Sequence, residues 1–474
     1  MSAIYLVPFV AAAPLLQGVM DPRLQAFFQV LAVALLALDF YRRGKVSAGP
    51  LTVLLAAAVL SALSVYFSPA REAVRFEWGA LAAGFCLFLV SRGQSVRDRA
   101  LTDRALRAAA WGVAAFALYQ AFVLRSPNIT STLINPNALA FFLLLAGPVA
   151  VSRGDFVLTA VLALVFFLTG SFGALLALIA AAAVMALIRL RKSGDRRMMV
   201  VLGALSLAAV LALTQSDFMS ADARLQWWRS ALSMIKESPL LGWGHSSYTW
   251  LAPLYKAPAA AEASIYAHNY YLEFAAENGI PAALAWFSLL GFAVSGARRL
   301  ALFGLLAALV HSAVDFGLSL PANFWLFCVL AGRELPAAEE EWAALPGAPA
   351  AAFAGTLAAA SALSVITPLA WEREMKAAAS HLEAGREEAA LAALDRAAAR
   401  PYGRSAAEES AGRLRFSRAM RSGGGGELFL AAVDFEKALL ETPSRVTSAA
   451  ALRAVYARAG APALAAHPRL GGER

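Results

Sequence analysis

Residues 172–188 read FGALLALIAAAAVMALI, and residues 189–197 read RLRKSGDRR. An apolar run ended at once by Arg and Lys is typical of a helix that crosses a bilayer, which needs roughly 20 residues. Similar runs recur on both sides of this one. We place the spans at residues 3–20, 24–41, 50–68, 74–90, 105–124, 133–151, 156–170, 172–190, 198–214, 280–297, 300–315, 318–332 and 350–370. The sequence therefore predicts an all-α, polytopic transmembrane protein of about 12–13 spans.

The composition agrees with a membrane protein and excludes other classes. Of the 474 residues, 60% are hydrophobic and only 15% are charged, whereas soluble domains carry roughly 25% charged residues. The net charge is +9, but the basic residues lie at the ends of the predicted spans, so we expect no nucleic-acid partner. Cys86 and Cys328 both lie in apolar runs, which excludes a disulfide scaffold or a multi-cysteine metal site. We expect no metal and no cofactor.

Basic residues alternate between the ends of the spans and predict the orientation. They follow the second, fourth, eighth and tenth spans: Arg42, Arg43 and Lys45; Arg92, Arg97, Arg99, Arg104 and Arg107; Arg189, Arg191, Lys192, Arg196 and Arg197; Arg298 and Arg299. Cytoplasmic loops carry such an excess, so the N-terminus is predicted to lie in the cytoplasm. With an odd number of spans, the long loop 215–279 and the C-terminal tail then face the outside, or the periplasm of a cell with an inner membrane.

The first run lacks a basic segment and a clear cleavage site, so we interpret it as a retained helix.

A change of composition divides the chain into a transmembrane domain, 1–371, and a tail, 372–474, rich in Ala, Glu, Arg and Leu. A spaced pattern occurs twice in the tail: Gly385, Ala390, Ala397 and Pro401, then Gly426, Ala431, Ala438 and Pro443. In such a pattern Gly makes a turn between two helices, Ala permits their close approach and Pro ends the second. The tail resembles tetratricopeptide repeats. An ordinary pair of helical hairpins is the alternative.

The loop 215–279 holds most of the polar residues that could carry chemistry. Residues 223–237 can form an amphipathic helix whose Trp227 and Trp228 suit a membrane surface. Arg224 and Arg229 are five residues apart and could flank a shared pocket, where guanidinium forks suit a diphosphate. The alternative is that both arginines reach the lipid headgroups.

Histidine is the other candidate for chemistry. His268 precedes an apolar helix, and a neutral imidazole there could accept a proton from a hydroxyl nucleophile. A single His is more often structural. His311 and Asp315 are four residues apart and would share one helix face, either as an oriented pair or as a polar contact between helices.

Several short motifs occur in a defined order. Residues 224–244 read RLQWWRSALSMIKESPLLGWG, followed by HNYYL at 268–272 and ENGIP at 277–281. The others are NPN at 135–137, TGSFGALL at 169–176, HSAVDF at 311–316 and PAN at 321–323. Together they resemble the O-antigen ligase and polymerase superfamily over about 130–330.

The resemblance implies a metal-independent, inverting glycosyltransferase on the outer face of the inner membrane. Its partners would be a polyprenyl-diphosphate-linked glycan, a hydroxyl acceptor, membrane lipids and a protein partner of the tail. By position, His268 would be the general base or would position the acceptor, and Arg224, with Arg229 beside it, would bind the diphosphate. The accessory candidates are His245, Lys256, Asn269, His311 and Asp315.

One position departs from the family pattern. Members of the superfamily usually carry Arg after the serine at 171, where this chain has Phe172. Lys256 or Arg125 could compensate, diphosphate binding could be weaker, or the chain could be a non-catalytic assembly protein. A transporter is a further alternative. Within the transferase interpretation, a ligase, a polysaccharide polymerase and a protein O-oligosaccharyltransferase stay open, with lipid A core, a glycan or a protein hydroxyl as acceptor.

Overall fold

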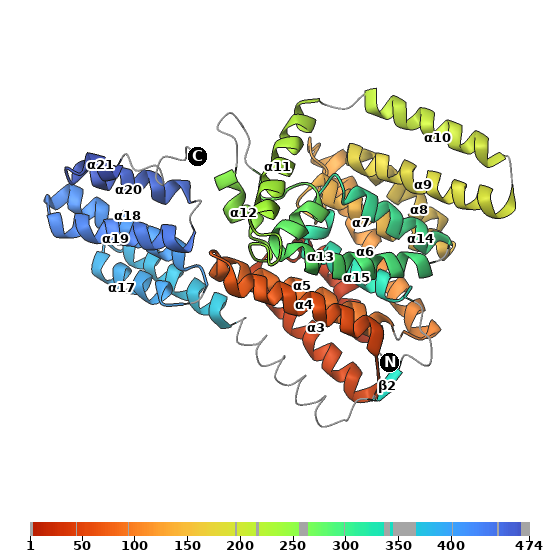
Figure 1. The fold of residues 1–474 in the computed structure, drawn as a ribbon, viewed down its shortest axis with the longest axis horizontal. Helices are drawn as coiled ribbons and strands as arrows, with labels where there is room; N and C mark the ends of the chain where they lie inside the picture. The colour runs from red at the N-terminus through yellow and green to blue at the C-terminus, as the bar shows by residue number, and fades with distance from the viewer. Residues whose placement is uncertain are drawn as a thin grey trace.

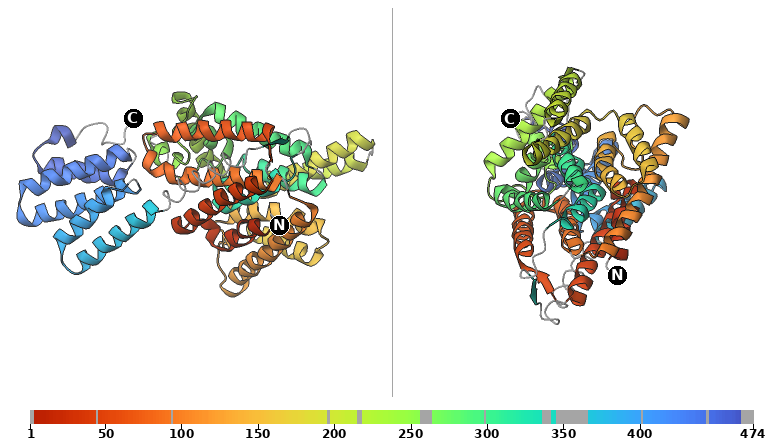
Figure 2. Two further views of the ribbon diagram at one scale, coloured as in Figure 1. Left: turned by 90° about the horizontal axis from the view of Figure 1, so that it is seen from below. Right: turned by 90° about the vertical axis from the view of Figure 1, so that its right-hand side faces the viewer.

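The structure is a computed structural model that describes residues 3–43, 45–92, 94–194, 197–214, 218–255, 264–297, 299–335, 342–344, 366–400, 402–442 and 445–465. The described residues are almost entirely helical. A bundle of apolar helices forms the main body, and the C-terminal helices project from one end of it (Figures 1 and 2). Two three-residue strands, β1 (Lys45–Ser47) and β2 (Trp342–Ala344), pair antiparallel. The all-α class is confirmed.

The bundle contains helices from residue 3 to residue 332. They are α1 (Ala3–Val7), η1 (Pro8–Ala12), α2 (Ala13–Leu15), η2 (Gln17–Val19), α3 (Pro22–Arg43), α4 (Ala48–Phe67), α5 (Arg71–Arg92), α6 (Val96–Leu118), η3 (Tyr119–Val123), α7 (Pro136–Ser152), α8 (Phe156–Leu168), α9 (Phe172–Ser193), α10 (Arg197–Thr214), α11 (Phe218–Glu237), α12 (Tyr248–Leu251), η4 (Ala252–Tyr255), α13 (Tyr270–Gly296), α14 (Arg299–His311), η5 (Gly317–Ser319) and α15 (Pro321–Gly332). Six helices are long and apolar enough to cross a membrane, and six shorter apolar helices accompany them among the described residues.

The predicted spans correspond to these helices, with three main differences. The helix α6 begins at Val96, nine residues before the predicted span 105–124. The run 350–370 lies almost entirely outside the described residues. The span predicted at 280–297 begins ten residues earlier, because α13 starts at Tyr270 and continues through Gly279 and Pro281. The predicted loop 215–279 is therefore largely helical, since it holds α11, α12 and the first turns of α13.

The centre of the bundle is α15, whose residues are all buried. A helix that is apolar on every side must be surrounded by other helices. Trp325 of α15 donates its indole N–H to the carbonyl of Ala80 in α5, at 2.9 Å. Gly84 permits the close approach of these two helices, because a Cβ there would lie 2.1 Å from the Phe324 ring. This packing fixes α15 against α5.

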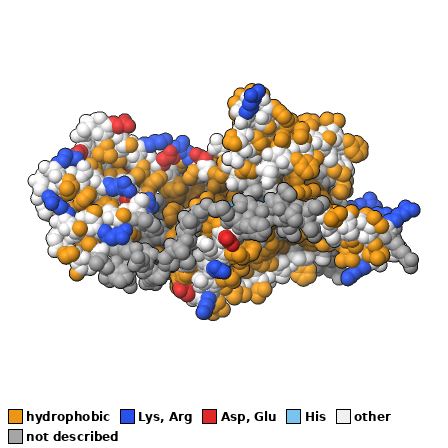
Figure 3. Space-filling view, turned by 90° about the horizontal axis from the view of Figure 1, so that it is seen from above, with side chains coloured by type: hydrophobic (Ala, Val, Ile, Leu, Met, Phe, Trp, Pro, Cys, Tyr) orange, Lys and Arg blue, Asp and Glu red, His pale blue; other side chains and the backbone are white. Residues whose placement is uncertain are grey.

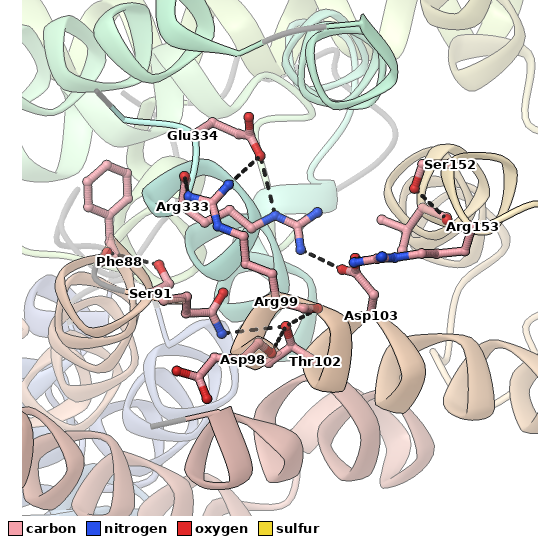
Figure 4. A network of polar contacts seen from close by, with 12 residues as sticks. Phe88, Ser91, Asp98, Arg99, Thr102, Asp103, Ser152, Arg153, Arg333 and Glu334 are labelled. Carbon is pink, nitrogen blue, oxygen red and sulfur yellow. Dashed lines mark hydrogen bonds and ion pairs between the residues drawn. The ribbon is translucent and has the colours of Figure 1, made fainter. Parts of the chain in front are cut away.

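A buried ion-pair network joins α6, α7 and α15 at one end of the bundle (Figure 4). Asp103 accepts from Arg153 at 2.6 Å on one oxygen and from Arg333 at 2.6 Å on the other. Arg333 also lies 3.5 Å from Glu334. Asp103 and Arg333 are both buried. This end holds two of the predicted cytoplasmic basic clusters.

We expect Asp103→Ala to lower the free energy of unfolding by about 3 kcal/mol, because it removes the nearest carboxylate from the buried Arg333 and leaves it only the more distant Glu334. Arg107→Ala is the matched control. Its pair with Asp155 is more exposed, so we expect a loss of less than about 1 kcal/mol. The measurement is denaturant unfolding in detergent. Equal losses in the two variants would contradict the stabilising role of the network.

The tail is a row of consecutive antiparallel helices at the opposite end. It begins with helical residues 366–383 and continues through α17 (Glu387–Ala398), α18 (Arg404–Ser422), α19 (Gly425–Glu441), α20 (Val446–Arg458) and α21 (Pro462–Ala465). Arg23 donates to Glu372 at 2.6 Å, and the Phe76 and Tyr402 rings lie 5.6 Å apart. These contacts hold the tail against the starts of α3 and α5.

The repeated tail pattern is reproduced in part. Gly385 makes a turn with φ 70°, and Ala390, Ala397, Ala431 and Ala438 are fully buried. The prediction for the second turn is wrong. Gly426 lies inside α19, and Gly423, with φ 70°, ends α18 instead. In a run of four glycines, the sequence alone does not show which glycine adopts the left-handed conformation that ends the helix. Pro401 and Pro443 lie outside the described residues.

Candidate functional site

The backbone at the start of α13 holds His268 in an unusual conformation. His268 has φ 50°, which is in the left-handed region that few residues other than glycine adopt. Asn269 caps α13, because its side-chain oxygen accepts from the Leu272 N–H at 3.0 Å. Trp228 of α11 donates its indole N–H to the carbonyl of His268, at 3.4 Å. These contacts fix the backbone on both sides of His268.

Aromatic rings enclose the His268 imidazole. Trp227 stacks on it, with centroids 4.7 Å apart and an angle of 24° between the planes. The Phe316 ring packs edge-to-face with the imidazole, with centroids 4.8 Å apart. Tyr266 in turn stacks on the Phe316 ring, with centroids 4.5 Å apart. The His268 side chain keeps 16% of its surface exposed. One part of the ring is therefore accessible from outside.

Asp315 brings together side chains from four separate segments. Its Oδ2 accepts from the Asn137 side chain at 2.7 Å and lies 3.9 Å from the Arg224 guanidinium. Its Oδ1 accepts from the Phe316 N–H at 2.8 Å and lies 3.7 Å from His268 Nδ1. Only 1% of the Asp315 side chain is exposed. We call this group, with His311, the Asp315 cluster.

Asp315 is a carboxylate at neutral pH. Burial would raise its pKa, but His268, His311 and the Phe316 amide outweigh burial and hold the pKa below the ordinary value. A buried carboxylate beside an imidazole stabilises the protonated ring and orients it. Asp315 therefore has the charge needed to support His268 when that ring takes up a proton.

His311 lies on the inner side of the Asp315 cluster and is fully buried. Neither of its ring nitrogens has a hydrogen-bond partner among the described residues. Gly173 at the start of α9 faces it, because a Cβ there would lie 3.7 Å from the imidazole. The predicted shared helix face is wrong. The α14 helix ends at His311, and Asp315 lies in the turn that follows.

The predicted cationic residues are separated in the structure. Arg224 is half-buried beside Asp315, whereas Arg229 is exposed on α11. Phe172 is half-buried and directly precedes Gly173, which faces His311. The position where this chain departs from the family pattern therefore lies beside the Asp315 cluster. Of the two proposed replacements, Arg125 is exposed after η3, and Lys256 lies outside the described residues. Arg224 is thus the arginine that the structure brings to Asp315 and His268.

Three glycines let the loop 238–244 pack closely against α13. Gly279 interrupts α13 with φ 82°, and a Cβ there would lie 2.2 Å from the Leu240 carbonyl. A Cβ at Gly242, which has φ 69°, would lie 2.5 Å from the Glu277 backbone. The Gly244 N–H donates to the Glu277 carbonyl at 2.7 Å. The loop and the broken helix therefore interlock, which only residues without a side chain permit.

His245 lies away from the Asp315 cluster. Its Nδ1 lies 3.6 Å from a Glu277 carboxylate oxygen and 3.3 Å from the Asn278 side-chain nitrogen. Burial lowers the pKa of His245 to about 4, so the ring is neutral at neutral pH. His245 therefore belongs to a second polar group, around Glu277.

We expect acid to destabilise the protein partly through His245. The unfolded chain protonates this ring near pH 6.5 but the folded protein does so near 4, so stability falls as pH drops between these values. The contribution lost at pH 5 is about 2 kcal/mol. The measurement compares thermal unfolding at pH 7 and pH 5 for the wild type and His245→Gln. An equal acid sensitivity of both proteins would contradict this assignment.

The sequence predicted some residues of this site but not the contacts between them. The NPN segment at 135–137 drew attention, but nothing in it predicts that Asn137 reaches Asp315 across 178 residues. Trp227 was predicted to lie at a membrane surface, but it stacks on the His268 ring instead. Contacts between distant segments carry no local signal in a single sequence.

Residues 157–287 match the model of a protein family described as O-Antigen ligase. This segment runs from α8 into α13 and includes Arg224, His245 and His268. It ends before His311 and Asp315, and it is shorter than the stretch of about 130–330 expected from the motifs. No curated protein matches the chain. The match supports the superfamily expected from the motifs and, with the apolar helices, a multi-pass membrane protein.

Proposed function

We propose that this protein transfers a glycan from a polyprenyl-diphosphate carrier to a hydroxyl acceptor. The observation that carries the proposal is the meeting of Arg224, His268 and Asp315 at one point. The family match supports glycan transfer in general. A cation, an imidazole and an orienting carboxylate are what this displacement requires.

In the proposed step, the acceptor oxygen forms a bond to the anomeric carbon as the bond from that carbon to the diphosphate oxygen breaks. The hydroxyl proton passes to Nε2 of His268, since Nδ1 faces Asp315. The electron pair leaves with the diphosphate, whose growing charge Arg224 stabilises. The 3.7 Å separation of His268 and Asp315 shortens as the ring becomes charged. A single displacement of this kind inverts the anomeric centre.

The test uses membranes with and without the protein, supplied with a labelled carrier-linked glycan. We expect transfer of label to a hydroxyl acceptor only when the protein is present. We also expect carrier-linked glycan to accumulate in a deletion strain. The chemical nature of the labelled product distinguishes a lipid, glycan or protein acceptor. No transfer and no accumulation would overturn the proposal and favour the assembly protein, which Phe172 keeps as the second candidate.

The proposal also requires an orientation. The tail and the loop 215–279 lie at the same end of the bundle, and we propose that this end faces outside the inner membrane. Lys and Arg side chains (blue) lie on the tail as well as at the opposite end of the molecule (Figure 3), so the orientation is proposed from the basic clusters that follow the spans. We expect an alkaline phosphatase fusion after Leu470 to be active and one near Lys192 to be inactive. The reverse pattern of reporter activity would invert the orientation.

A further inference from the structure

A cavity of about 440 Å³ lies where the bundle, the loop 215–279 and the tail meet. Its lining comes from α5, α13 and η5, from the loop around His245, and from the tail at Trp371, Tyr402 and Arg445. In the view from above, the surface is hollowed between the tail and the bundle and lined with hydrophobic side chains (Figure 3). We call this cavity the tail pocket. The mechanism described above does not use it.

Carboxyl groups dominate the polar lining of the tail pocket. Glu273 accepts from Ser319 at 2.6 Å and from the Ala267 N–H at 2.7 Å. Glu277 accepts from the Tyr248 N–H at 3.1 Å, and Glu77 accepts from Gln25 at 2.8 Å. Among the described residues, no Lys or Arg forms an ion pair with these three carboxyl groups. Each carboxyl oxygen can accept further hydrogen bonds from a ligand.

The basic groups of the tail pocket do not offset these carboxyl groups. Arg445 pairs with Glu409, and Arg404 lies 3.0 Å from Glu441. His245 is neutral, because burial lowers its pKa to about 4. An anion such as the carrier diphosphate therefore competes with Glu409 and Glu441 for these arginines, and the pocket suits a ligand that donates hydrogen bonds.

Aromatic side chains supply the other wall. Trp250 and Tyr266 come from the loop, and Trp371 and Tyr402 come from the tail, where their rings lie 5.5 Å apart. The Trp371 indole nitrogen is buried and has no hydrogen-bond partner among the described residues. Gly403, with φ 66°, makes room for this ring, because a Cβ there would lie 2.4 Å from Trp371 Cε2. The wall thus offers flat apolar faces and one unused donor.

We infer that the tail pocket binds a sugar unit of the acceptor that carries no negative charge, which assigns the tail a share in acceptor recognition. Sugars present hydroxyl donors at their edges and apolar C–H faces, which match carboxyl groups and aromatic rings respectively. The inference rests on the proposed function. The Tyr266–Phe316 stack separates the tail pocket from His268, so the bound unit is remote from the reacting hydroxyl. Its binding energy holds the acceptor in position for the reaction.

The first test measures binding without chemistry. Saturation-transfer NMR on the full-length protein in detergent would use glucosamine, N-acetylglucosamine and glucuronic acid as probes. We expect signals from the first two and none from glucuronic acid. His268→Ala should keep these signals, because His268 does not line the tail pocket. Trp371→Phe and Glu277→Gln should weaken binding about tenfold, the effect of losing one buried hydrogen bond. Trp111→Phe, an exposed indole on α6, is the matched control and should change nothing.

The second test measures transfer with the same variants at matched folded protein. We expect Trp371→Phe to raise KM for the acceptor about tenfold while KM for the carrier-linked glycan stays constant. Absence of sugar signals, or wild-type binding by both pocket variants, would overturn the inference even if transfer is intact. Sugar binding without any transfer by the wild type would instead remove the proposed function and leave a saccharide site.

Discussion

Replacing His268 by alanine is expected to reduce glycan transfer by two to four orders of magnitude, the usual contribution of a positioned base. A hydroxyl is a poor nucleophile at neutral pH, and the removal of its proton lowers the barrier as the new bond forms. His268 is packed between Trp227 and Phe316 and lies 3.7 Å from the Asp315 carboxylate. The measurement is transfer from a labelled carrier-linked glycan in membranes that contain equal amounts of protein.

Two further variants separate the possible roles of His268. Gln can position a hydroxyl through a hydrogen bond but cannot accept its proton at neutral pH. Substantial transfer by His268→Gln with none by His268→Ala would therefore indicate positioning. Asp315→Asn keeps the size of the side chain but removes the charge that stabilises the imidazolium, so it should also lower transfer. His381→Ala in the tail is the control for loss of an imidazole. Full transfer by both His268 variants would leave this residue with a structural role.

The membrane helices could be predicted because each carries its own signal. A bilayer requires a long apolar run with internally paired backbone groups, so the α9 sequence alone indicates a span. The predicted span at 280–297 omits the first turns of α13, because Glu273, Glu277 and Asn278 interrupt the apolar pattern there. Those polar residues are buried against the loop and the tail pocket, and not against lipid.

The candidate site could be predicted only in part. Arg224 and His268 lie in one sequence motif, and the structure brings both to Asp315. Arg229 belongs to the same motif but is exposed, because five residues on a helix of 3.6 residues per turn point it away from Arg224. The tail pocket had no sequence signal, since Glu277, Trp371 and Tyr402 meet only after the tail has docked. Helical periodicity describes each helix and does not describe how distant helices meet.

Replacing Arg224 by alanine is expected to lower transfer by roughly two orders of magnitude, the effect of losing one charged group that stabilises developing charge. The leaving diphosphate gains negative charge as its bond to the sugar breaks, and Arg224 is the arginine held beside His268 and Asp315. We expect transfer to depend more heavily on Arg224, because this chain has Phe172 where the resemblance implies an arginine. Arg224→Lys should also lose much of the activity, because lysine keeps the charge without the planar fork that matches two phosphate oxygens.

Arg229→Ala is the matched control for Arg224, since both arginines lie on α11 and only Arg224 reaches Asp315. We expect Arg229→Ala to keep near-normal transfer. Arg224 also neutralises a buried carboxylate, so the thermal unfolding midpoint of each variant must be compared with the wild type before activities are compared. A folded Arg224→Ala protein with normal transfer would make Arg224 a headgroup anchor. A larger loss in Arg229→Ala than in Arg224→Ala would move the diphosphate to the exposed face of α11, away from His268. Only a loss confined to Arg224 places the leaving group and the base on the same side of Asp315, which a single displacement requires.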